Sequence, residues 1–200
     1  MPETGSGTLA EGEMKEFPRL TTARLTLRAF DSTDVDDVVR LAGDFAIADT
    51  TLVIPHPYDR AAAEKWLATH RPRFDEGQEL ILAVTASGAG TLVGAIGLSI
   101  DSRFDRAEIG YWIGKPYWGQ GYCTEAGRAM RDWGFSELGL NRIYATHFKR
   151  NPASGRVMQN LGMKREGELR QHVKRWDRYE DMVVCGILRD EWVACRAKLV

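Results

Sequence analysis

The feature that most limits how this chain can fold is a strand, a glycine-rich turn, a helix and a second strand in direct succession over residues 106–149. In "RAEIGYWIG" alternate residues are apolar, which is typical of a strand. "TEAGRAMRDWGFSEL" has the apolar spacing of a helix, and "NRIYATHF" is again typical of a strand. Because two strands joined through a helix lie parallel with a right-handed connection, we expect a parallel pair in this sheet.

Further strand patterns lie on both sides of this unit. "RLTLRAF", at residues 24–30, alternates between apolar and polar residues. "ELILAVTA" and "TLVGAIGLSI" are separated by "SGAG", which indicates a hairpin. "MKREGELRQHV" and "RYEDMVVCGIL" predict two final strands joined around "KRWD".

Helix signals fill the remaining segments. "DSTDVDDVVRLAGD" predicts a helix that ends near Gly43, and Asp59 is a candidate N-cap for the next helix. Pro72 is expected to end or kink that second helix. In "NPASGRVMQNLG", Asn151 suits an N-cap and Gly162 a C-terminal stop. "RDEWVACRAKLV" predicts a tail with a partial helix.

Together these elements predict a single domain of the α/β class, with one mixed sheet and helices on both faces. A chain of 200 residues is long enough for one domain with a substantial core. We expect a disordered lead-in over 1–18, the domain over 19–193 and a C-terminal tail over 194–200. The lead-in has neither the basic segment nor the apolar segment of a signal peptide.

Composition excludes several functional classes. A net charge of -1 argues against a globally basic protein that binds nucleic acid or an anionic membrane. The three cysteines form no CxxC pair and suit a reducing cytoplasm, and the four histidines lack metal-ligand spacing. No apolar run approaches the roughly 18 residues that span a bilayer. We expect a cytoplasmic protein that needs no metal, and a homodimer stays open.

The glycine-rich turn, "WIGKPYWGQGYCTEA", fits neither common nucleotide motif. A dinucleotide fingerprint needs a third glycine where Thr124 stands, and a Walker A loop needs Ser or Thr after Gly-Lys, where Pro116 stands. What remains is a helix N-terminus whose free amides can bind phosphate. A tight connection without a ligand is the alternative. The amide donors would belong to Gln120, Gly121, Tyr122, Cys123 and Thr124.

Several motifs in register resemble one known family. "AEIGYWIGKPYWGQGYCTEA" resembles the central motif of the GCN5-related N-acetyltransferase (GNAT) superfamily, in its ribosomal-protein alanine N-acetyltransferase (RimJ/RimL-like) branch. "RLTLRAF", "NPASGRVMQNLGM", "REGELRQ" and "DRYEDMVVCGILRDEW" also resemble that branch, over roughly residues 20–193. The resemblance implies a mostly antiparallel twisted sheet with a splayed parallel strand pair, and acetyl-CoA as cosubstrate.

The resemblance also implies where acetyl-CoA would lie. The splayed strands would be 106–114 and 141–149. Gly110 would mark a bulge or a close approach that helps the strands part, with tight packing against a neighbour as the alternative. Cys123 departs from the family pattern, because Gly or Ala is usual there. Asn151 and Ser154 match cofactor-side positions. The alternative is plain helix capping for Asn151 and an ordinary first-turn position for Ser154. The pantetheine arm would pair with the backbone of Tyr111, Trp112 and Ile113. The pyrophosphate would lie on the loop of Trp118, Gly119, Gln120, Gly121, Tyr122, Cys123 and Thr124.

Direct acetyl transfer to an amine needs three groups, which the resemblance places as follows. Glu108 is the candidate base, with an ordinary solvent-facing strand acid as the alternative. A backbone N–H near Ile113 would stabilise the developing oxyanion. Ser154 is the candidate donor to the leaving thiolate, with Tyr144 or Tyr122 as other options. A covalent role for Cys123 is disfavoured because no histidine partner is evident.

The acceptor is the least determined part of the prediction. The resemblance implies a protein N-terminal α-amine of ribosomal type as the acceptor. At neutral pH roughly a tenth of such amines are already neutral, so they need only a weak base. A small amine (antibiotic, polyamine or amino-acid derivative) is the first alternative, and a non-catalytic acyl-CoA-binding module is the second. The acceptor pocket is expected from segments 44–58, 60–76 and 172–179. No direct contact with nucleic acid or membrane is expected.

Overall fold

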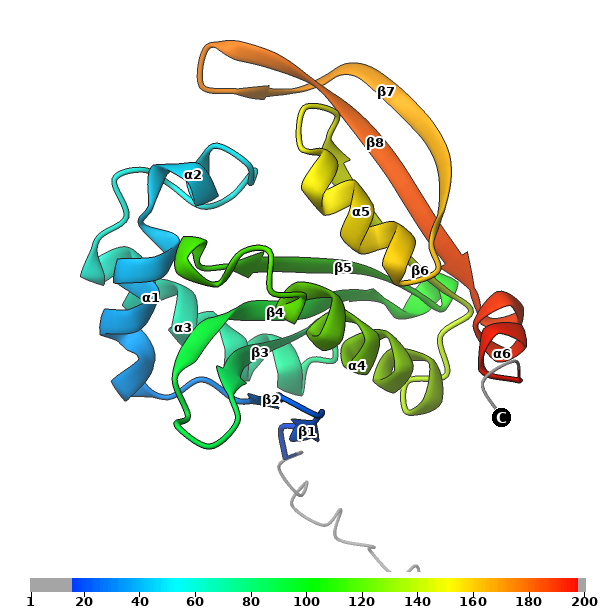
Figure 1. The fold of residues 1–200 in the computed structure, drawn as a ribbon, viewed down its shortest axis with the longest axis horizontal. Helices are drawn as coiled ribbons and strands as arrows, with labels where there is room; N and C mark the ends of the chain where they lie inside the picture. The colour runs from blue at the N-terminus through cyan, green and yellow to red at the C-terminus, as the bar shows by residue number, and fades with distance from the viewer. Residues whose placement is uncertain (1–15, 198–200) are drawn as a thin grey trace, which may run out of the picture.

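One sheet of eight strands forms the centre of the computed structural model, which describes residues 16–197 (Figure 1). Across the sheet the strands follow the order β1-β2-β3-β4-β5-β6-β8-β7. Neighbouring strands pair antiparallel except β5 and β6, which pair parallel, so the predicted fold class is confirmed. The strands are β1 Leu20–Thr21, β2 Leu25–Arg28, β3 Glu79–Ala86, β4 Leu92–Asp101, β5 Arg106–Ile113, β6 Arg142–Phe148, β7 Lys164–Arg175 and β8 Arg178–Leu188.

The helices agree with the predicted order and add one short element. Asp59 and Asn151 are N-caps as predicted, since each side chain accepts a backbone N–H of the first turn. The four-residue helix α2 was not predicted, because one turn carries no periodic signal. No helix in the described part of the chain is long and apolar enough to cross a membrane. The helices are α1 Val35–Ala42, α2 Phe45–Ala48, α3 Arg60–Asp75, α4 Tyr122–Ser136, α5 Pro152–Asn160 and α6 Arg189–Ala197.

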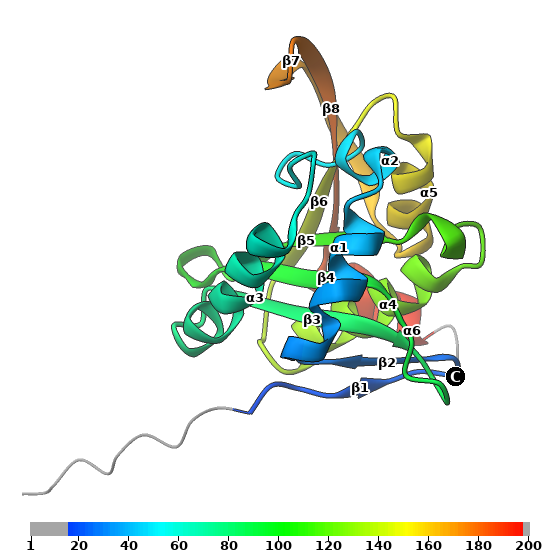
Figure 2. The ribbon, with the colours of Figure 1, turned by 90° about the vertical axis from the view of Figure 1, so that its left-hand side faces the viewer.

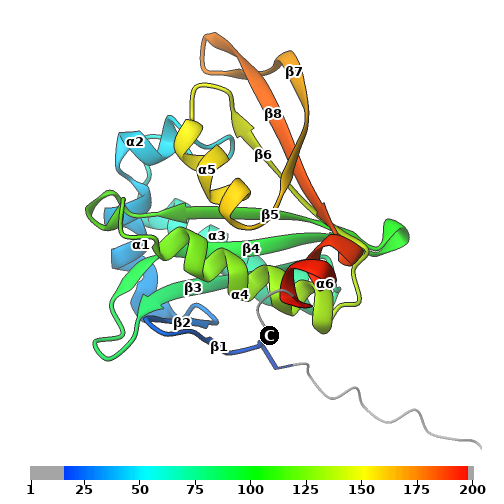
Figure 3. The ribbon, with the colours of Figure 1, turned by 45° about the vertical axis from the view of Figure 1, so that its right-hand side comes forward.

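Helices cover both faces of the sheet, and each face has its own apolar core (Figures 2 and 3). Successive residues of a strand point to opposite faces. On β3, Ala83 packs with residues of α1 and α3, whereas Leu82 and Val84 pack with residues of α4 and α5. The alternation seen in the sequence therefore separates two layers, and it determines which side of β5 each active-site side chain faces.

The helix α3 does not end at Pro72, which was one of the two outcomes predicted there, because it continues through this residue to Asp75. A proline inside a helix removes one backbone hydrogen bond. Here packing compensates: Phe74 lies against the core, and its ring stacks on Phe17 with a centroid distance of 4.3 Å. Residues 1–15, most of the predicted lead-in, lie outside the described residues, whereas Phe17 packs on the domain.

His70 is a titratable group buried on the face covered by α1 and α3. Its side chain is 5% exposed and packs against Phe30 and Trp66. Within residues 16–197 its Nε2 has no hydrogen-bond partner. Burial, and then the positive charge of Arg73, lower the pKa of His70 to about 4. The imidazole is therefore neutral in the folded protein at neutral pH.

We expect His70→Phe to remove part of the acid sensitivity of the fold. Between pH 4 and about 6.5 the unfolded chain binds a proton at His70 and the folded chain does not, so His70 makes stability fall with falling pH. Across that window the loss is on the order of 3 kcal/mol. Urea denaturation of the wild type and the variant at pH 4.5 and 7 measures this loss of unfolding free energy. Because both proteins share all other titrating groups, the contributions of those groups cancel when the two pH dependences are compared. Parallel pH dependence in the variant and the wild type would contradict this account.

Candidate active site

The parallel strands β5 and β6 separate after a short paired segment. The paired register joins 106–108 to 142–144 and ends there. Beyond this point β5 stays paired with β4 and β6 with β8, so the two strands diverge (Figure 1). The expected splayed pair is confirmed, and the gap between its strands is the centre of the candidate site.

The backbone of β5 presents alternate residues to this gap. The carbonyl of Trp112 points into the sheet, since a Cβ added at Gly94 on β4 would lie 2.2 Å from that oxygen. Backbone groups of successive strand residues point to opposite edges. Tyr111 and Ile113 therefore direct their N–H and C=O groups toward the gap. Of the three residues expected to pair with a pantetheine arm, these two are oriented for it.

Trp118 covers part of this backbone edge. Its indole Nε1–H donates to the carbonyl of Ile113, at 2.5 Å, while the residue remains 47% exposed. The carbonyl of Ile113 therefore already has a partner within the chain. The N–H of Ile113 is left as the backbone donor at this point of the gap.

The loop after β5 ends in a helix N-terminus with free amides. Gly119 and Gly121 have φ angles of +75° and +79°, which L side chains rarely adopt. Gly121 is the N-cap of α4 and provides no side-chain cap, and the first bond of the helix runs from Glu125 N to Gly121 O at 3.0 Å. Amides before that bond can bind an anion at the positive helix end. They belong to Tyr122, Cys123 and Thr124.

Thr22 and Arg24, in the connection between β1 and β2, support this loop. Glu125, in the first turn of α4, would by its charge oppose anion binding. Arg24 pairs with it, with 2.7 Å between Nε and Oε2, and Thr22 Oγ1 donates to its other oxygen at 2.6 Å. Arg24 also donates to the carbonyl of Gln120 at 3.0 Å. Sequence reasoning missed this contact, which joins residues 101 positions apart and leaves no local pattern.

Polar side chains lie on both faces of the gap. Glu108 and Tyr111 are three residues apart on one strand, so their side chains leave opposite faces. On one face, Glu108 Oε1 accepts a hydrogen bond from Thr146 Oγ1 at 2.9 Å. On the other, the hydroxyl of Tyr111 lies 2.9 Å from Ser154 Oγ. A carboxylate and a hydroxyl pair thus flank the point where the strands part.

The start of α5 holds Ser154 beside the gap. Asn151 Oδ1 accepts from the N–H of Ser154 at 3.3 Å, which orders the first turn. The next residue, Gly155, allows a close approach to β6, since a Cβ there would lie 3.0 Å from His147 Nε2. The two predicted residues Asn151 and Ser154 are therefore brought to the gap by one helix end.

Cys123 lies beside this hydroxyl pair but is unsuited to attack a thioester. Burial raises the pKa of its thiol to about 12, so the thiol is protonated at neutral pH. Its side chain packs against the same core as Tyr111. Among residues 16–197 no group of three His, Cys, Asp or Glu side chains could hold a metal ion. Cys123 therefore fills space beside Tyr111.

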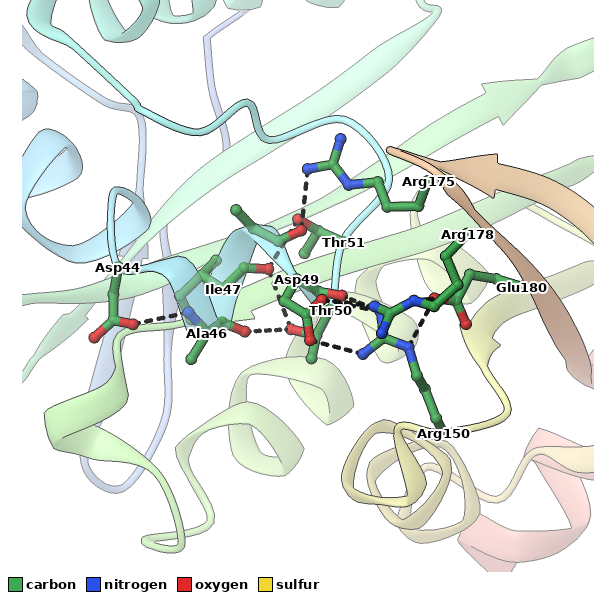
Figure 4. Close-up of polar contacts among 11 residues, drawn as sticks. Asp44, Ala46, Ile47, Asp49, Thr50, Thr51, Arg150, Arg175, Arg178 and Glu180 are labelled. Carbon is green, nitrogen blue, oxygen red and sulfur yellow. Dashed lines mark hydrogen bonds and ion pairs between the residues drawn. The ribbon is translucent and has the colours of Figure 1, made fainter.

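On the Glu108 face, a ring of charges ties α2 to the far side of the gap (Figure 4). Asp49, which follows α2, pairs with Arg150 and Arg178, and both arginines pair with the buried Glu180 on β8. The four N–O distances are 2.8 to 2.9 Å. Arg175 adds hydrogen bonds to the backbone carbonyls of Ala48 and Ile54. These contacts fix α2 against the β7–β8 hairpin.

An open space of about 600 Å³ lies between α2 and this hairpin. It joins two of the three segments expected to form the acceptor pocket, 44–58 and 172–179. The third, 60–76, is mostly helix α3, and its residues Ala63, Trp66 and Leu67 pack in the core with α1. The lining residues are Phe45, Asp49, Arg175, Trp176, Asp177 and Arg178.

Gly110 shows neither a bulge nor tight packing against a neighbour. It pairs with Gly97 in an unbroken register, so there is no bulge toward β4. A Cβ at this position would meet nothing within 4 Å, so there is no tight packing either. Gly110 lies two residues from Glu108 and therefore on the same face. It leaves empty room beside the carboxylate.

Comparisons with known proteins agree with this geometry. The family described as an acetyltransferase (GNAT) domain matches residues 24–164. The N-acetyltransferase p20 of Bacillus licheniformis is 30% identical over 174 residues, which cover 86% of this chain and 97% of that protein. YdaF of Bacillus subtilis, named provisionally as a ribosomal N-acetyltransferase, is 36% identical over 104 residues, or 52% of this chain and 57% of YdaF.

A solved GNAT-family acetyltransferase from Bacillus anthracis shares the fold. Its TM-score is 0.77 at 25% sequence identity, over 86% of this chain and 99% of that one. The splayed strands, the free amides at the start of α4 and the family match all lead to the same assignment. The chain belongs to the GNAT family and is an N-acetyltransferase that uses acetyl-CoA as its cosubstrate.

Proposed function

We propose that the acceptor is a protein N-terminal α-amine, of the ribosomal-protein type, and that Glu108 accepts its proton. The observation that carries this proposal is the position of Glu108 at the parting of β5 and β6, hydrogen-bonded to Thr146. A carboxylate is a weak base. It suits an α-amine, whose pKa is about 7.7–8.0, better than a lysine amine near 10.4.

We propose the remaining roles as follows. Acetyl-CoA supplies an activated thioester when bound. The amides from Gln120 to Thr124, with Gly119, would hold its pyrophosphate, and Trp118 would border that site while bracing Ile113. The N–H of Ile113 would donate to the carbonyl oxygen as negative charge develops there. Ser154 would donate a hydrogen bond to the departing sulfur, and Asn151 would orient the helix turn that carries it.

The open space between α2 and the β7–β8 hairpin supports a peptide acceptor. The space between α2 and the β7–β8 hairpin opens on the surface, and Phe45 and Trp176 at its rim are 53% and 42% exposed. A peptide that follows the acceptor N-terminus could lie along this rim, where Phe45 and Trp176 stack with a centroid distance of 5.4 Å. The provisional ribosomal assignment of YdaF points to the same acceptor class.

A panel of acceptors tests the proposal. Purified protein and acetyl-CoA are combined with peptides that carry ribosomal-protein N-termini, the same peptides with a blocked N-terminus and an internal lysine, spermidine and an aminoglycoside. Release of free thiol measures turnover. The free N-terminal peptides are expected to give the highest kcat/KM. Preference for spermidine or the aminoglycoside would assign the small-amine class instead, and CoA binding without any turnover would indicate a non-catalytic module.

We expect Gly110→Val to impair use of the acceptor but not of acetyl-CoA. The valine side chain would occupy the open room beside Glu108 on the acceptor face. The KM for the peptide should rise about tenfold or more, equivalent to about 1.4 kcal/mol of binding. Gly110→Ala is the graded control and should have a smaller effect. An unchanged acceptor KM in the valine variant would show that the amine does not pass this position.

A further inference from the structure

A partly buried hydroxyl contact joins β5 to α5 beside the gap. The Tyr111 hydroxyl lies 2.9 Å from Ser154 Oγ and 3.3 Å from the Ser154 carbonyl oxygen, although the residues are 43 positions apart. Tyr111 packs against the apolar core with Cys123. The ring is thus held from the side, and its hydroxyl is directed at the start of α5.

The environment of Tyr111 keeps its hydroxyl protonated. Burial raises its pKa well above the ordinary value of 10, and the neighbouring Cys123 raises it further. Ser154 Oγ can accept from this hydroxyl while its own proton stays free. A hydroxyl that accepts a hydrogen bond becomes a better donor, because hydrogen bonds in a chain polarise one another.

We propose that Tyr111 is a positioning residue that directs the Ser154 hydroxyl proton at the leaving sulfur. The proposal rests on the role proposed above for Ser154. In the reaction the amine nitrogen forms a bond to the acetyl carbon, the C–S bond breaks, and its electron pair goes to sulfur. The proton of the amine goes to Glu108. Ser154 donates to the sulfur as charge develops, Tyr111 donates to Ser154, and Tyr111 keeps its own proton.

A consequence is that the Tyr111 hydroxyl stabilises the transition state of C–S bond breakage more than it stabilises the bound thioester. The sulfur carries little charge in the bound thioester and gains it as the C–S bond breaks. An interaction that strengthens only then raises kcat and leaves KM unchanged. Loss of the Tyr111 hydroxyl should therefore lower kcat about five- to tenfold, the effect of one hydrogen bond, with the KM for acetyl-CoA within about twofold of wild type.

A double-mutant cycle of Tyr111→Phe and Ser154→Ala tests the proposal. If Tyr111 acts through Ser154, Tyr111→Phe should change kcat less than about twofold once Ser154 is alanine. In a Ser154→Thr background, which keeps a hydroxyl, Tyr111→Phe should again lower kcat. Tyr117→Phe is the matched control, because Tyr117 is also a partly buried tyrosine packed on the core. This variant should leave kcat unchanged in both the wild-type and the Ser154→Ala background.

The outcomes separate this proposal from the role of Ser154 itself. If Ser154→Ala kept the wild-type kcat, Ser154 would have no role in the reaction, and this proposal would be wrong as well. A slow Ser154→Ala enzyme in which Tyr111→Phe costs the same factor as in wild type would leave Ser154 in place and overturn the positioning role. Thermal unfolding and CoA affinity of each variant check that the isosteric change to phenylalanine leaves the fold intact.

Discussion

Replacing Gly121 with aspartate is expected to abolish acetyl-CoA binding, with a loss in affinity of at least about 100-fold, or about 2.7 kcal/mol. The carboxylate would lie at the positive end of α4, where the free amides of the first turn would otherwise hold a pyrophosphate. A Cβ at this position would also approach Arg24 Nη2 to 3.5 Å, so the new charge would be held in place.

The control for this variant is Gly88→Asp. Gly88, in the turn between β3 and β4, has a φ of +89° and open space around its Cβ position. The substitution brings the same charge and the same backbone strain at a site away from the gap. Calorimetry with acetyl-CoA compares the two variants. Equal affinities would show that the pyrophosphate does not lie on this loop.

Local patterns predicted most elements that surround the gap. Apolar alternation located β2 to β8, and capping residues located the starts of α3 and α5. The parallel pair followed from the helix that connects its strands. Patterns of this kind involve residues that are close in the sequence. They therefore predict a helix or strand correctly where those nearby residues determine its structure. Pro72 shows the limit: the local rule predicts a break, but Phe74 packs against Phe17 and the helix continues.

The contacts that complete the site could not be predicted in the same way. Arg24 contacts Glu125 beside the glycine-rich loop, 101 positions away in the sequence. Tyr111 contacts Ser154, 43 positions away. Each depends on how two elements meet after folding, and nothing in the local sequence of Arg24 or Tyr111 marks its partner. The charge ring around Asp49 likewise forms only when α2 meets β8 (Figure 4). The sequence therefore predicted the strand, turn and helix around the glycine-rich loop better than the contacts around α2.

Replacing Glu108 with glutamine is expected to lower kcat about 100-fold or more, the usual range for loss of a general base. Glutamine keeps the size of the side chain and can still accept from Thr146 Oγ1, which donates to Glu108 in the wild type at 2.9 Å. The variant therefore removes the charge and the basicity while preserving the shape of the gap. The KM for acetyl-CoA should not change, because Glu108 and the hydroxyl pair lie on opposite faces of β5.

The pH dependence of this variant distinguishes a base from a structural acid. Below a pH of about 8 most α-amine acceptors are protonated, so the base is needed most. Above that pH the amine is already neutral, and the deficit of Glu108→Gln should shrink. It should stay larger for a lysine acceptor, which is still protonated there.

Glu79→Gln, on β3 and paired with Arg73, is the matched control and should keep the wild-type profile, since this acid lies two strands from the gap. If Glu108→Gln also kept the wild-type pH–rate profile, the proton of the amine would have to leave by another route. A chain of water molecules could suffice for an α-amine but not for lysine, because only the α-amine is neutral to a useful extent near pH 7. That result would still favour an N-terminal acceptor, while removing Glu108 from the reaction.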